Sequence, residues 1–160
     1  MCSSDLPLAA GLVRAVALAS ERLAAHGGSD PIGPLRDQLL ERLLVLPGLE
    51  LSGPDPRCPA PRAAMTLQRL PHHLSLLVSN SAAEPVSGRR LVQSLWQQGF
   101  AASSGSACSS GRQAPSPVLL AMGYTPEQAS SSLRLSLGPW HNTSVLAQLP
   151  AALERARSCL

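Results

Sequence analysis

The 160-residue sequence contains no lysine, so all 13 of its basic residues are arginines. This absence argues against a phosphate-binding P-loop, which ends in Gly-Lys followed by Ser or Thr. No basic run is longer than Arg89-Arg90, and the formal net charge is only +3. We therefore expect no nucleic-acid partner, because nucleic-acid-binding surfaces gather many cations on one face.

Aromatic and charged residues are also scarce. Phe, Trp and Tyr make up 2% of the chain and charged residues 14%, whereas apolar residues make up 44%. The core must therefore consist of Leu, Val and Ala, and the low charge indicates that some helix faces are covered by further protein. Because no apolar stretch reaches the roughly 18 residues of a membrane span, and no secretory signal pattern is present, we expect a cytoplasmic protein.

The four cysteines lie far apart in the sequence, at Cys2, Cys58, Cys108 and Cys159. None of them forms a C-x-x-C pair, so we expect neither a structural zinc site nor a redox dithiol. A chain of this length with this many core residues also needs no disulfide framework. Among the cysteines, the surroundings of Cys108 are the most unusual.

Hydrophobic periodicity predicts an alternation of helices and short strands. The expected helices are 8–25, 35–46, 87–98, 117–122, 126–130 and 143–157, and the expected strands are 50–52, 74–78, 100–102 and 133–137. Pro150 is expected to kink the last helix. Because the connections are short, we expect an α+β fold with helices on one face of a short, mainly antiparallel sheet.

A loop of small polar residues surrounds Cys108. Five of the nine residues from Ser103 to Gly111 are serines and two are glycines. A nucleophilic cysteine reacts as the thiolate and must be accessible, and a loop of this composition favours both mobility and access. A free cysteine also occurs as a small buried apolar residue, and this alternative stays open. A Cys-His hydrolase is disfavoured, because no histidine has a distinctive spacing to Cys108.

Arg134 is the second candidate site residue. The leucines of Leu133-Arg134-Leu135-Ser136-Leu137 alternate strictly, which places Arg134 and Ser136 together on the opposite face of the strand. A guanidinium group there has the planar geometry that suits a carboxylate. The alternative is an arginine that is simply solvated on an open sheet face.

Three segments of the sequence carry a family resemblance: Ser103-Ser-Gly-Ser-Ala-Cys108-Ser-Ser-Gly111, Met122-Gly123 and Ser131-Ser-Leu-Arg134-Leu-Ser-Leu-Gly138. Together they resemble the C-terminal part of the cysteine desulfurases of the NifS/IscS type, within the class V aminotransferases. Earlier segments agree in order, namely Leu35-Arg36-Asp37, Leu46-Pro47-Gly48-Leu49 and Arg69-Leu70-Pro71. The likeness extends from about Leu6 to the C-terminus.

The resemblance implies the small C-terminal domain of a fold-type I pyridoxal phosphate (PLP) enzyme. Residues 31–160 would form this domain, with the catalytic loop at 103–111, and residues 1–30 would form a helix that packs on a large domain. Cys108 would take the sulfur of L-cysteine held on PLP, leaving L-alanine and a Cys108 persulfide. Arg134 would bind the substrate carboxylate. The complete enzyme would be a homodimer that passes sulfur to an acceptor or scaffold protein for iron–sulfur cluster or thiocofactor assembly.

The family holds PLP as a Schiff base on a lysine, and this chain has none. We therefore assign no cofactor-binding or metal-binding residue to the chain and expect it to be inactive alone. His72-His73 stands where relatives tend to have asparagines, and we interpret the pair as polar residues at a strand entry. Two alternatives stay open: a stand-alone persulfide carrier or binding module, and an inactive truncated fragment.

Overall fold

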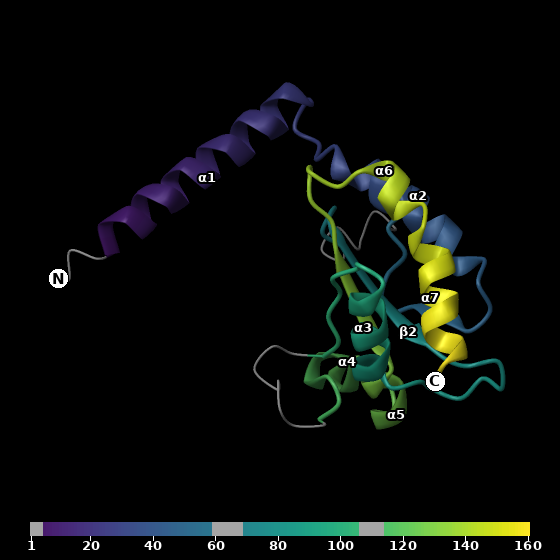
Figure 1. Ribbon diagram of the computed structural model, residues 1–160. Coiled ribbons are helices and arrows are strands. Elements are labelled where there is room, and N and C mark those ends of the chain that lie inside the picture. Colours follow the sequence, from purple (N-terminus) through teal and green to yellow (C-terminus); the bar gives the residue numbers. More distant parts are fainter. Residues whose placement is uncertain (1–4, 59–68, 106–113) are drawn as a thin grey trace.

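The computed structural model describes residues 5–58, 69–105 and 114–160 (Figure 1). The helices are α1 (Asp5–Ala25), α2 (Ile32–Leu44), α3 (Gly88–Gln97), α4 (Pro117–Ala121), α5 (Pro126–Ser130), α6 (Thr143–Leu146) and α7 (Leu149–Ser158). The strands are β1 (Leu49–Leu51), β2 (His73–Val78) and β3 (Ser132–Ser136). Within the described residues, no helix combines the length and the apolar character needed to cross a membrane.

The three strands form one antiparallel sheet in the order β1-β2-β3. The register pairs Leu77 of β2 with Glu50 of β1 and with Ser132 of β3, and it pairs Ser75 with Arg134. The predicted α+β class with a short antiparallel sheet is therefore confirmed. Because the side chains of a strand alternate between its two faces, this register decides which residues enter the core and which remain on the opposite face.

The main core lies between one face of the sheet and helices α2, α3 and α7. Leu74, Leu76 and Val78 of β2 are buried on this face. They pack with buried leucines of β3 and of the three helices, among them Leu133, Leu135, Leu40, Leu43, Leu91, Leu95 and Leu153. Leucine supplies most of this core, as the composition predicted, because each such side chain removes a large apolar area from water.

Helices α4 and α5 lie on the other face of the sheet, so the prediction of helices on one face alone is wrong. Leu77 of β2 points to this second face and packs with Leu119 of α4 and Ala129 of α5, next to Tyr124. These two short helices cover one end of the face. The rest of the face bears the polar side chains of β2 and β3.

Two further predictions are corrected. The stretch 100–102 is not a strand, and instead Ser103 alone forms a bridge to Arg134. The expected helix over 143–157 is two helices, and Pro150 lies in the first turn of α7 rather than at a kink. Proline is favoured in a first turn because its missing N–H would have no helical partner there.

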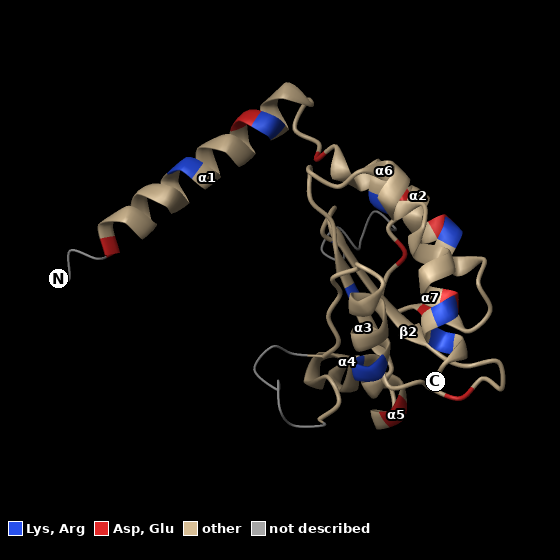
Figure 2. Cartoon of the chain, viewed as in Figure 1, with Lys and Arg blue, Asp and Glu red and all other residues tan. Residues whose placement is uncertain are grey.

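Helix α1 extends away from the rest of the chain (Figure 1), and none of its residues is buried. Six of its large apolar side chains are 48–76% exposed, at Leu6, Leu8, Leu12, Val13, Val16 and Leu18. Charged residues are few along this helix (Figure 2). Two of them, Arg14 and Glu21, form an ion pair at 3.4 Å. A helix with so wide an apolar surface is typical of one that packs against more protein.

Two helical glycines should respond in opposite directions to an added methyl group. A Cβ on Gly88 of α3 would lie 2.5 Å from the backbone oxygen of Ser132, whereas a Cβ on Gly33 of α2 would meet nothing within 4 Å. We expect Gly88→Ala to lower the free energy of unfolding by about 1–3 kcal/mol, because α3 must move off the sheet. Gly33→Ala should raise it by about 0.5–1 kcal/mol.

Urea unfolding followed by circular dichroism measures both changes. A Gly88→Ala variant that is as stable as the unsubstituted chain would contradict the close approach of α3 to β3.

Candidate functional site

The polar part of the second sheet face is centred on Arg134 of β3. Arg134 lies opposite Ser75 in the register, and His73 lies opposite Ser136. The hydroxyl groups of Ser75 and Ser52 form a hydrogen bond of 2.6 Å, which extends the polar surface to the segment after β1. The alternation of leucines with Arg134 in β3 thus produces the face that it predicted.

Arg134 connects β3 to the segment that precedes Cys108. Its backbone N–H donates to Ser103 O at 2.7 Å, and Ser103 N–H donates to Arg134 O at 3.0 Å. The side chain is half-buried, and its Nη1 group donates to Gly105 O at 3.1 Å. These hydrogen bonds hold Arg134 in place. The bond to Gly105 uses only one of the five N–H donors of the guanidinium group, so others remain for another acceptor.

Cys108 itself lies outside the described residues, and its predicted role stays a prediction. Gly105 is the last described residue before it in the chain. Of the two predicted site regions, the structure therefore brings Arg134 together with the beginning of the serine-rich loop.

Arg69 is a second arginine on this face, and sequence reasoning did not assign it to the site. Its Nε group donates to Pro54 O at 3.3 Å, and its Nη2 group donates to Ser52 O. Its Nη1 group contacts the Nδ1 atom of His73 at 3.4 Å. Burial, followed by the charge of Arg36, lowers the pKa of Arg69. The motif Arg69-Leu70-Pro71 contributed to the resemblance, but nothing in it indicated this contact.

The surroundings of His73 favour its neutral form. An arginine N–H beside Nδ1 requires this nitrogen to accept, which places the remaining ring proton on Nε2. Burial lowers the pKa of His73, and the positive charges of Arg69, Arg134 and His72 lower it further. The interpretation of the His72-His73 pair as polar residues at a strand entry agrees with this position at the start of β2.

The charges of this face suit an anion. Arg69 and Arg134 are both close enough to lower the pKa of His73. Among the described residues, no carboxylate forms an ion pair with either guanidinium group. Arginine binds a carboxylate through two parallel hydrogen bonds, so an unpaired guanidinium on a partly buried face is a suitable carboxylate site.

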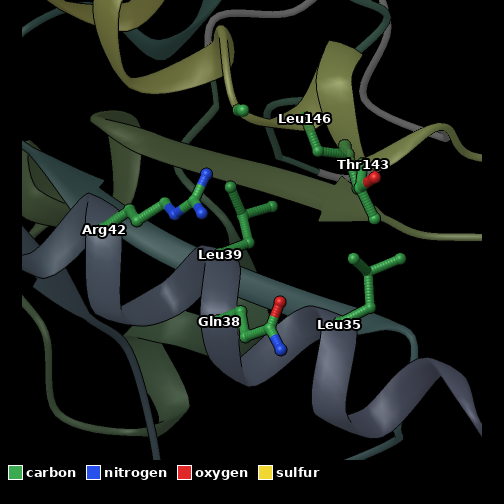
Figure 3. A pocket seen from close by; sticks show the side chains of 7 residues that line it. Leu35, Gln38, Leu39, Arg42, Thr143 and Leu146 are labelled. Atoms are coloured by element: carbon green, nitrogen blue, oxygen red, sulfur yellow. The ribbon is translucent and has the colours of Figure 1, made fainter.

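A shallow pocket lies elsewhere, between α2 and α6 (Figure 3). It is lined by Leu35, Gln38, Leu39, Arg42, Thr143, Leu146 and Ala147. The lining includes leucines of the helical layer but neither Arg134 nor Arg69, so the pocket is separate from the polar face. It contains no cysteine or histidine that could act as a nucleophile or base.

Comparison with known proteins gives a consistent set of relatives, although no protein-family model matches the sequence. "Cysteine desulfurase IscS 1" of Archaeoglobus fulgidus is 29% identical over 160 aligned residues, which cover 98% of this chain and 37% of that protein. "Cysteine desulfurase IscS" of Methanosarcina thermophila is 31% identical over 160 aligned residues, with 98% and 35% covered. The chain thus spans little more than a third of the length of these relatives.

A solved structure of a NifS-like protein shares the fold. It aligns with 94% of this chain and 33% of its own length, at a TM-score of 0.67 and 23% sequence identity. The sheet and its helices therefore have the arrangement found in NifS-like proteins.

We expect a nuclear magnetic resonance titration to give His73 a pKa below its ordinary value of 6.5, because burial and two nearby arginines oppose protonation. Arg69→Gln should raise this pKa by removing one of the positive charges. Arg155→Gln is the matched control, since Arg155 of α7 hydrogen-bonds to Gln98 at 3.0 Å instead. An unchanged pKa in Arg69→Gln would contradict the contact.

The same shift has a consequence for stability. The unfolded chain binds a proton at His73 more readily than the folded chain does, so the free energy of unfolding should decrease as the pH falls below about 6.5. Arg69→Gln should make this decrease smaller.

Proposed function

Because the chain belongs to the cysteine desulfurases of the NifS/IscS type, whose C-terminal portion it matches, we propose that it provides two functional groups of such an enzyme. These are the sulfur-accepting thiol of Cys108 and the carboxylate-binding guanidinium of Arg134. The hydrogen bond of 3.1 Å between Arg134 Nη1 and Gly105 O carries the proposal, because it joins β3 to the beginning of the Cys108 loop.

Arg134 binds the carboxylate of L-cysteine through the N–H groups that Gly105 does not use. A charged donor and a charged acceptor form a stronger hydrogen bond than a neutral pair, especially on a partly buried surface. The positive charge of Arg69 adds to the attraction, and the same charge lowers the pKa of His73. Asp55 is close enough for its charge to act on Arg69, but its carboxylate is ion-paired with Arg57 at 2.6 Å and forms no ion pair with either arginine of this face.

Cys108 accepts the sulfur atom of the substrate. Its thiolate attacks this sulfur, and a sulfur–sulfur bond forms as the carbon–sulfur bond of the substrate breaks. The electron pair of the broken bond stays on carbon, which takes up a proton and becomes the methyl group of L-alanine. Cys108 is left as a persulfide that a sulfur-acceptor or scaffold protein then receives for iron–sulfur cluster or thiocofactor assembly.

The residues of this chain do not fit PLP as a covalent partner. A Schiff base needs a lysine amine, and none of the 160 residues is lysine. In PLP enzymes the cofactor supplies an electron sink for the substrate carbon. Residues outside this chain must hold the cofactor, so this chain contributes the thiol and the guanidinium alone.

Residues 1–30, of which 5–30 are described, pack on the part of the enzyme that corresponds to the remaining length of the relatives. The exposed apolar side chains of α1 support this arrangement, because packing against another domain would remove this apolar surface from water. Residues 31–160 form the small domain around the leucine core. The complete enzyme is a cytoplasmic homodimer.

A chimeric desulfurase tests the two roles. In it, this chain replaces the matching portion of the Methanosarcina thermophila relative, and alanine and protein persulfide are measured with L-cysteine. Cys108→Ala should abolish the persulfide, whereas the matched control Cys159→Ala should retain it, since Cys159 is an exposed free cysteine outside the loop. Arg134→Lys should raise KM for L-cysteine roughly tenfold to a hundredfold, because it loses the two-pronged contact.

Persulfide formation in the Cys108→Ala chimera would overturn the role of Cys108. An unchanged KM in Arg134→Lys would overturn the role of Arg134.

The chain by itself should not release alanine or sulfide from L-cysteine, even with added PLP, because it has no lysine to form the Schiff base. The measurement compares the purified chain with an active desulfurase at equal concentration. Release of alanine or sulfide by the chain alone would contradict the proposal that residues outside this chain hold the cofactor. Mass measurement of the chain after incubation with that desulfurase shows whether Cys108 also accepts sulfur as a separate carrier.

A further inference from the structure

The segment from Ser103 to Gly105, which we call the loop root, is attached to β3 at several points. The backbone groups of Ser103 and Arg134 exchange two hydrogen bonds, of 2.7 and 3.0 Å. Beyond them, Gly105 O accepts from Arg134 Nη1 at 3.1 Å, and Gly105 N–H donates to the Ser132 hydroxyl at 3.4 Å. Both side chains that hold Gly105 come from β3, two residues apart on one face.

The other side of the loop root is closed by α3. Gly88 is buried in the first turn of this helix, and a Cβ there would lie 3.1 Å from Ser104 Cβ and 2.5 Å from Ser132 O. Only a glycine allows α3, the loop root and β3 to approach this closely. Ser104 is therefore confined between the helix and the strand.

Gly105 ends this attachment with a backbone turn. Its φ angle of +67° lies in the left-handed region that glycine adopts readily and alanine does not. A Cβ at Gly105 would meet nothing within 4 Å, so the requirement for glycine is conformational rather than steric. The chain thus leaves β3 at a defined residue.

We propose that the loop root is a fixed anchor for the Cys108 loop and that Ser132 and Arg134 are positioning residues for sulfur transfer at Cys108. The proposal rests on the proposed function, since it assumes that Cys108 accepts sulfur. Arg134 then has two tasks, because one guanidinium both holds Gly105 and binds the carboxylate. Ser132 has the positioning task alone.

The short distance along the chain gives the anchor its effect. Cys108 follows Gly105 by three residues, and three residues span at most about 11 Å when fully extended. A Gly105 that is fixed on β3 therefore keeps Cys108 within that distance of Gly105, whatever conformation the intervening residues adopt. Confining a nucleophile near its target raises its effective concentration.

Amide hydrogen exchange on the full chain tests the anchor without sulfur chemistry. Ser132→Ala removes the acceptor of Gly105 N–H, so we expect protection of the Gly105 and Ser103 amides to fall roughly three- to tenfold. Gly99→Ala is the matched control. Gly99 also has a positive φ, of +85°, and open space around it, but it ends α3 rather than the loop root.

The chimeric desulfurase tests the positioning role. Ser132→Ala should lower the rate of Cys108 persulfide formation roughly three- to tenfold while KM for L-cysteine stays unchanged, because Arg134 is intact. Gly105→Ala should lower this rate too, and Gly105→Asn should lower it less, since asparagine tolerates the left-handed region. Gly99→Ala carries a similar backbone strain and should leave the rate unchanged.

Two results would overturn the proposal. One is exchange at Ser103 and Gly105 that Ser132→Ala does not alter relative to Gly99→Ala. The other is a persulfide rate in Ser132→Ala and Gly105→Ala equal to that of Gly99→Ala. A wild-type chimera that forms no persulfide on Cys108 would instead overturn the proposed function, and the positioning role with it.

Discussion

The antiparallel pairing of β2 with β3 is the constraint on which the rest of this structure depends. It sets Leu76 beside Leu133 on the core face and Ser75 beside Arg134 on the other. A slip of one residue would move the leucines out of the core and the arginine into it, so burial of leucine fixes the register. The position of Arg134 on the polar face is thus a consequence of core packing.

Much of this arrangement follows from local sequence patterns. The alternation around Arg134 and the helical spacing of α2 and α3 were sufficient to predict the fold class, because both signals come from neighbouring residues. The hydrogen bonds of Arg69 to the backbone oxygens of Pro54 and Ser52 join it instead to the segment after β1, 15 and 17 residues away in the chain, and no local pattern contains them. The bridge of Ser103 to Arg134 was missed for the same reason, since it joins residues far apart in the chain.

For helix α1, the sequence predicts the helix but not the surface on which it packs. Its periodicity was sufficient to predict a helix, yet the described residues include no surface that covers it. Leu12 and Val16 are 66% and 58% exposed, whereas Leu39, Leu40 and Leu43 of α2 are buried. Exposed apolar area on this scale is unfavourable in water. The chain spans little more than a third of the length of its relatives, and the proposed covering surface for α1 is the part of the enzyme that corresponds to their remaining length.

The absence of lysine and the polar sheet face both support the proposal that residues outside this chain hold the cofactor, while this chain supplies the thiol and the guanidinium group. Without lysine, the chain can contribute no Schiff base, but its arginines remain charged at every physiological pH. A permanently charged guanidinium is suited to holding a carboxylate, and a small-residue loop beside it is suited to presenting a thiolate. Because Arg134 also donates a hydrogen bond to Gly105, the proposed substrate-binding group and the proposed support of the Cys108 loop are one side chain. Under this proposal, substitution of Arg134 should change both substrate binding and loop positioning, whereas substitution of Ser132 should change loop positioning alone.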